Sequence, residues 1–121
     1  MGHPVIHFEI PATDVEKLKR FYSDLFGWTM QSTAFPELCM VTTAAEGHGI
    51  NGAIMKRQAA QQTHLNYVSI ESVEAFSAKV SQLGGQIVVP KTAVPKMGYF
   101  AVCLDPEGNS IGLWEMDPSA A

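Results

Sequence analysis

The residues best suited to chemistry lie near the N-terminus of this 121-residue chain. His7 and Glu9 alternate with the apolar residues Ile6, Phe8 and Ile10. Residues two apart in a strand point to the same face, so this period places His7 and Glu9 together and the apolar side chains opposite them. A histidine beside a carboxylate is suited to general acid–base catalysis near neutral pH. We predict His7 and Glu9 as catalytic residues, with cavity lining as the alternative interpretation.

The composition argues against several classes of partner. Eight Lys and Arg residues stand against twelve Asp and Glu, a net charge of −4, so no basic surface is expected for nucleic acid or a membrane. No apolar stretch approaches the roughly 18 residues of a membrane helix. Two cysteines, Cys39 and Cys103, are too few for a disulfide scaffold. We therefore expect one globular domain, residues 1–121, in a reducing cytoplasmic setting.

Two segments carry the signals of amphipathic helices. In the first, Thr13 and Glu16 fit a capping box, and apolar residues recur at steps of three and four from Val15 to Phe26. Gly27 supplies a left-handed stop. The second segment, 73–83, follows the same design, with Ser72 as its cap and Gly84-Gly85 at its end.

The other apolar segments are short and bounded by Gly, Pro, Asn and Asp, which is typical of strands. Strands are predicted over residues 5–10, 29–33, 38–43, 53–56, 65–70, 86–90, 99–104 and 111–116. Residues 90–98 are predicted as the longest loop, because Pro90, Pro95 and Gly98 punctuate them.

The order of these elements repeats along the chain. A strand, a helix and three strands are followed by the same series, and an offset of 58 residues places Val73 on Val15 and Asn109 on Asn51. The predicted fold is therefore α+β, built from two tandem βαβββ modules. Module 1 covers about 3–58 and module 2 about 62–117.

Several short motifs occur in a fixed order between these elements. They are His7 with Asp14 seven residues on, Phe21-Tyr22 followed by Leu25-Phe26-Gly27-Trp28, the pair Gly84-Gly85, and Asp105-Pro106-Glu107-Gly108-Asn109 before the last strand. With the two modules, they resemble the vicinal oxygen chelate superfamily of glyoxalase I, bleomycin-resistance proteins and extradiol dioxygenases, and within it a group of small bacterial glyoxalase-like proteins. The resemblance implies a cup-shaped, mostly antiparallel eight-stranded sheet with two helices outside, and a homodimer.

The resemblance also implies four metal-ligand positions, which in the enzymes hold a divalent metal such as Zn, Ni, Fe or Mn. The first-strand position falls on His7, and its repeat partner is Leu65. The last-strand position, seven residues after Asp105, falls on Gly112, and its repeat partner is Ile54. Transition-metal sites need three or more N, O or S ligands. We therefore predict no metal cofactor, with His7 as the only retained ligand position.

Strand parity and the repeat predict which residues line the cup. Tyr67 and Ser69 share a face of one strand, and Trp114 shares a face with Gly112. Adding side chains from rims and loops, the predicted ligand-binding residues are Tyr67, Ser69, Trp114, Phe35, Met55 and Met97. Such a pocket suits a flat or apolar molecule. Ordinary core packing is the alternative for Tyr67 and Trp114.

The predicted function is a glyoxalase-like protein that binds a small apolar or aromatic organic molecule in its cup, with the four-ligand metal site lost. Three functions stay open. The first is a binding or sequestering protein, as drug-resistance members are. The second is a metal-dependent lyase, isomerase or dioxygenase using His7 and a rebuilt ligand set. The third is a metal-free enzyme or regulatory subunit that moves protons with His7 and Glu9.

Overall fold

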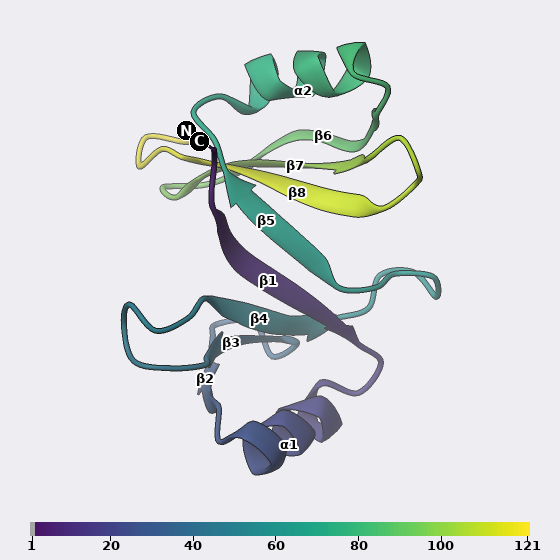
Figure 1. Ribbon diagram of the computed structural model, residues 1–121. Coiled ribbons are helices and arrows are strands. Elements are labelled where there is room, and N and C mark those ends of the chain that lie inside the picture. The colour runs from purple at the N-terminus through teal and green to yellow at the C-terminus, as the bar shows by residue number, and fades with distance from the viewer. Residues whose placement is uncertain (1) are drawn as a thin grey trace. The chain divides into compact units, whose positions relative to one another are not determined.

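The computed structural model describes residues 2–121, which divide into two compact units (Figure 1). The first unit is His7–Leu65; the second joins the residues up to Ile6 to Asn66–Ala121. Each unit contains four strands that pair side by side and one helix. The predicted α+β class with two βαβββ modules is confirmed.

The first unit carries its helix between its first two strands. Its elements are β1 (Val5–Ala12, of which Val5 and Ile6 are counted with the second unit), α1 (Val15–Phe26), β2 (Thr29–Ser32), β3 (Leu38–Thr42) and β4 (Asn51–Lys56). The strands lie in the order β2-β3-β4-β1. The β1–β4 pair is parallel and the other two pairs are antiparallel.

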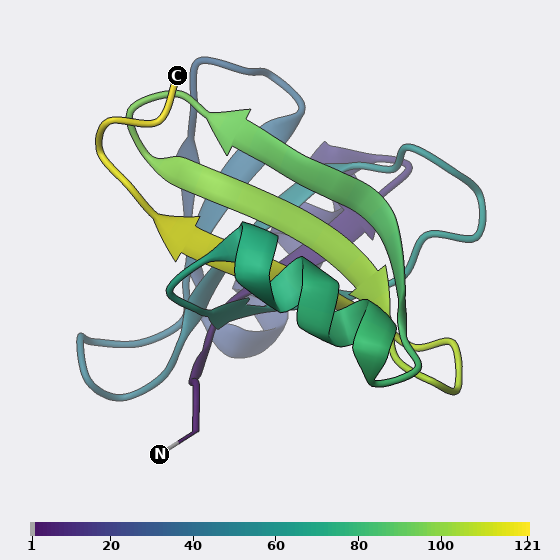
Figure 2. The same cartoon turned by 90° about the horizontal axis from the view of Figure 1, so that it is seen from above.

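The second unit repeats this arrangement. Its elements are β5 (Leu65–Ser69), α2 (Val73–Gln82), β6 (Gln86–Val94), β7 (Gly98–Leu104) and β8 (Ser110–Met116), in the order β5-β8-β7-β6. Again only the pair of first and last strands, β5 and β8, is parallel. Helix α2 packs against β6, β7 and β8, and Figure 2 shows it lying across these strands.

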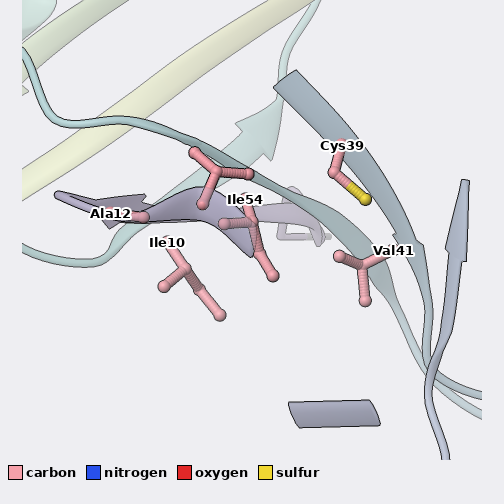
Figure 3. Packing of buried hydrophobic residues seen from close by; sticks show 6 residues of the cluster. Ile10, Ala12, Cys39, Val41 and Ile54 are labelled. Carbon is pink, nitrogen blue, oxygen red and sulfur yellow. The ribbon is translucent and has the colours of Figure 1, made fainter. Parts of the chain in front are cut away.

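The core of the first unit lies between its sheet and α1. Figure 3 shows Ile10, Ala12, Cys39, Val41 and Ile54 gathered there, and Val15 of α1 and Phe8 belong to the same cluster. The predicted helix-side placement of Phe8 and Ile10 is confirmed. Ile6 is 37% exposed and lies outside this core.

Both ends of α1 are defined by single residues. Asp14 is extended (φ −127°), and its carboxylate accepts a hydrogen bond from the N–H of Lys17 at 3.1 Å. The predicted cap at Thr13 is therefore wrong, because Asp14 is the residue directly before the first helical turn and can reach its free N–H groups. The predicted stop at Gly27 is confirmed by its φ of 71°.

The N-terminus of α2 is capped twice. The Ser72 hydroxyl accepts from the N–H of Ala75 at 3.1 Å, as predicted. A carboxylate oxygen of Glu115, on β8, accepts from the N–H of Val73 at 2.8 Å. A negative charge at this end of a helix also interacts favourably with the positive end of the helix dipole. The Glu115 contact joins α2 to β8, the last strand of the unit.

The conformation of the connection before β8 is fixed by the carboxylate of Asp105, which belongs to that connection. Asp105 Oδ1 accepts from the N–H groups of Glu107 and Asn109 at 2.9 and 3.0 Å. These hydrogen bonds, with the Asn109 side chain, hold the pKa of Asp105 below its usual range. The Asp105–Asn109 motif therefore has a structural explanation.

The predicted loop over 90–98 is mostly strand. β6 continues to Val94, with irregular register between Ile87 and Val89 and between Val89 and Thr92. β6 ends the strand order of its unit, and an edge strand tolerates a residue such as Pro90 that has no N–H to donate. The loop prediction was wrong because the strand order, which makes this an edge, is not readable from local composition.

Two exclusions concern membranes and disulfides. Neither helix in residues 2–121 combines the length and apolar character needed to cross a membrane. Cys39 and Cys103 are free and buried in separate core clusters. Burial, with the negative charge of Asp105, raises the pKa of the Cys103 thiol, so this side chain stays protonated at neutral pH.

The cap of α1 gives a direct test of the helix end. Replacing Asp14 with Ala should lower the free energy of unfolding by about 1 kcal/mol, because one N–H of the first turn loses its partner. Asp24→Ala, in the last turn of the same helix, is the matched control and should not destabilise the protein. Equal destabilisation by the two variants in urea titrations would contradict the assignment of the cap.

Candidate functional site

The first candidate surface is the helix-free face of the first unit, defined by His7, Glu9, Met40, Ala53 and Met55. Ladder partners in a sheet point to the same side, and Ala53 is the partner of both Glu9 and Met40. Met55 is paired with Pro11, two residues beyond Glu9. This side is opposite to Ile10 and the α1 core.

His7 and Glu9 form the polar centre of this face. Their Nε2 and Oε2 atoms are 3.9 Å apart, and the side chains are 28% and 22% exposed. Burial lowers the pKa of His7 below its ordinary value of 6.5. The carboxylate would favour protonation, but 3.9 Å is longer than a hydrogen bond, and burial has the larger effect. The imidazole is therefore neutral at pH 7 and able to accept a proton.

One of the four metal-ligand positions requires correction. The repeat offset assigned Ile54 to a metal-ligand position, which would have to share the face of His7, but Ile54 pairs in register with Ile10 and is fully buried in the α1 core. The physical reason is a change of offset: β4 begins at Asn51 and β8 at Ser110, which is 59 residues rather than 58. A one-residue slip exchanges the two faces of a strand.

The correct counterpart of Gly112 is Ala53. Gly112 pairs with Tyr67, which follows Glu9 by the repeat offset of 58, and Glu9 pairs with Ala53. Ala53 offers no metal donor either. The donor set of the superfamily's enzymes therefore does not fit these positions, since Leu65, Ala53 and Gly112 supply no side-chain N, O or S. In residues 2–121, no three His, Cys, Asp or Glu side chains group to hold a metal ion.

The second candidate surface is the helix-free face of the second unit, defined by Tyr67, Ser69, Phe100, Gly112 and Trp114. Tyr67 pairs with Gly112, while Ser69 and Phe100 both pair with Trp114. The opposite side carries the α2 core, which contains Val68 and Leu113. The predicted common face for Tyr67, Ser69 and Trp114 is thus observed.

The ring of Tyr67 covers Gly112. A Cβ atom added at Gly112 would overlap the ring carbons of Tyr67, which is only 7% exposed. Tyr67 also meets Phe100 edge to face, with ring centroids 6.5 Å apart. The space at the last-strand ligand position is therefore filled by a phenol ring.

Trp114 covers a second glycine. A Cβ at Gly98 would lie 2.8 Å from Cζ2 of Trp114, so the indole packs against the start of β7. Trp114 and Phe100 remain half-buried. The face therefore presents accessible aromatic surface next to a well-packed tyrosine.

The remaining predicted ligand-binding residues are dispersed. Met55 shares a face with His7 and Glu9, whereas Phe35 and Met97 lie in connections and are 67% and 59% exposed. Sequence reasoning missed Phe100 of the second face. Its alternation with the buried Ala101 and Cys103 indicates that Phe100 lies on the opposite face of the strand from them. The register that pairs Phe100 with Trp114 cannot be seen in the sequence.

Comparisons with known proteins agree on one family. Residues 5–113 match the family model described as Glyoxalase/Bleomycin resistance protein/Dioxygenase superfamily. A glyoxylase-like domain-containing protein of Didymella fabae is 32% identical over 109 residues, covering 84% of this chain and 85% of that protein. The putative glyoxylase CFP32 of Mycobacterium bovis is 27% identical over 116 residues, covering 88% of this chain but only 43% of its own length.

A solved structure extends the likeness to the fold. The hypothetical protein BH1468 from Bacillus halodurans C-125 has a TM-score of 0.69 over 100% of this chain and 99% of its own, at 12% identity. At that identity the likeness concerns the fold alone.

The lowered pKa of His7 predicts a pH dependence of stability. As the pH falls through 6.5, the unfolded chain binds a proton on this residue before the folded protein does, so the free energy of unfolding decreases. His7→Gln should lose less stability than the native protein between about pH 7.5 and pH 5. His48→Gln, which replaces an exposed histidine, is measured in parallel as the matched control. An unchanged slope for His7→Gln in denaturant titrations would contradict the burial of this imidazole.

Proposed function

Because this chain belongs to the Glyoxalase/Bleomycin resistance protein/Dioxygenase superfamily, we propose that it binds a small, apolar or aromatic organic molecule without the divalent metal of the superfamily's enzymes. The ligand lies against the helix-free face of the second unit. The observation that carries the proposal is the Tyr67 ring over Gly112, which fills the last-strand ligand position. A carboxylate there would require Tyr67 to move.

The chemistry of this face supports a flat, apolar ligand. Trp114 and Phe100 are half-buried, and Tyr67 holds Phe100 edge to face. Aromatic side chains contribute large apolar areas, and each Å² withdrawn from water contributes about 25 cal/mol. Ser69, the ladder partner of Trp114, offers one hydroxyl that could orient a polar substituent.

On this proposal the protein sequesters its ligand rather than transforming it. The activity of the longer mycobacterial relative is not assigned to this chain, because the chain spans only 43% of that protein's length. A homodimer and a cytoplasmic setting stay predictions from the resemblance and the composition.

The two tryptophans allow binding to be located directly. Coumarin, a neutral flat aromatic molecule, should cause a saturable shift of the Trp114 indole N–H signal in ¹⁵N-edited NMR. Trp28, which packs in the α1 core cluster, is the internal control and should not shift. The signals are assigned with Trp28→Phe.

Variants of two phenylalanines sharpen this test. Phe100→Ala should weaken coumarin binding by about tenfold, because it removes an aromatic wall of the face. Phe21→Ala, on the exposed side of α1, is the matched control and should bind as the native protein does. Equal shifts of both indoles, or no saturable shift, would reject the proposed ligand site.

A second candidate function is metal-free proton transfer, and the His7–Glu9 pair favours it. A neutral His7 can take a proton from a carbon acid, and the Glu9 carboxylate, whose Oε2 lies 3.9 Å from His7 Nε2, would favour the imidazolium that forms. Hydroxyacetone in D₂O would then exchange its carbon-bound hydrogens faster with the native protein than with His7→Gln or Glu9→Gln. Exchange unaffected by either variant would exclude this role.

A further inference from the structure

A groove of about 630 Å³ lies beside α1 in the first unit. It is lined by Leu18 and Tyr22 of α1, by Ile10 near the end of β1, and by residues of the connection 57–64 after β4. His7 and Glu9 point to the opposite side of the sheet from α1, so this groove is distinct from the helix-free face.

Arg57 is the positively charged side chain of this groove, and its position is fixed by main-chain atoms. Its guanidinium donates to the carbonyl oxygens of Gln62 and Pro11, the latter at 3.4 Å. Its own N–H donates to the carbonyl of Ala12 at 2.8 Å, which ties the start of the connection to the end of β1. The two guanidinium bonds use two of five N–H donors.

The groove lacks a negative charge to balance this arginine. Although the chain carries twelve Asp and Glu residues, none lines the groove, and in residues 2–121 no carboxylate lies within ion-pair distance of Arg57. Arg57 is half-buried, and His64 and Thr63 add further possible donors. A partly desolvated cation without a counter-charge favours an anion beside it.

The residues from α1 and β1 give the groove an apolar part. The Tyr22 ring stacks on Trp28, with centroids 5.3 Å apart and planes inclined by 12°. Leu18 and the mostly buried Ile10 continue this surface. The volume falls in the range of about 300–1,000 Å³ that is usual for small-molecule sites. A ligand with an anionic group beside Arg57 and an apolar body beside Leu18 and Tyr22 would match both parts of the groove.

We propose that this groove binds a small organic carboxylate, with the carboxylate on Arg57 and the apolar body against Leu18 and Tyr22. Arginine suits this role because its planar N–H groups match the geometry of a carboxylate. The site is separate from the proposed ligand face and takes a ligand of different charge.

Benzoate and benzamide test the proposal on the full, unaltered chain. They share shape and ring, but only benzoate is anionic. Benzoate should cause saturable shifts of the backbone amide signals of residues 57–64, with an affinity at least tenfold above that of benzamide. Equal affinities, or benzoate shifts confined to the Trp114 indole, would overturn the proposal without affecting the coumarin result.

The chain contains two arginines, which supplies a matched control. Arg57→Gln should weaken benzoate binding at least tenfold and leave the weak binding of benzamide unchanged, whereas Arg20→Gln, on the exposed side of α1, should bind benzoate as the native chain does. Native-like benzoate affinity in Arg57→Gln would overturn the proposal. If Arg57→Gln disturbs the connection 57–64, the comparison of benzoate with benzamide on the native protein still tests the proposal.

Discussion

The parallel pairing of the first and last strands of each unit determines what every face of the protein carries. In the β1–β4 pair, Ile10 and Ile54 point together into the α1 core, which leaves Glu9 and Ala53 together on the other side. In the β5–β8 pair the same rule directs Val68 and Leu113 to α2 and joins Tyr67 to Gly112. A slip of one residue would bring apolar core residues to the helix-free faces, so burial of the cores holds the register.

That register has a chemical consequence for the superfamily's metal positions. Glycine at position 112 leaves room on the strand, and the ladder partner opposite it is a tyrosine whose ring takes that room. In the first unit the corresponding position is an alanine beside Glu9. The fold of the superfamily is thus present, while a tyrosine ring fills the space at one of the implied positions and an alanine stands at another. His7 and Glu9 on the first strand form a polar pair on the helix-free face of the first unit.

Local signals in the sequence were sufficient for some features and insufficient for others. Alternation in β1 predicted the face shared by His7 and Glu9, and the glycines after both helices predicted their ends, because each depends on a few neighbouring residues. The placement of Ile54 failed, since it depends on a one-residue change of offset between distant strands. The Arg57 groove was also missed, because it forms only when a connection, a helix and a strand end meet.

We propose that side-chain packing has replaced the metal positions of the superfamily in this protein. The decisive measurement is calorimetric titration of the metal-free protein with Zn²⁺, Ni²⁺ and Mn²⁺, in parallel with His7→Gln and the control His48→Gln. Any weak metal binding should then have the same affinity in the native protein and in His7→Gln. Tight binding of one ion per chain that is lost in His7→Gln and kept in His48→Gln would contradict it.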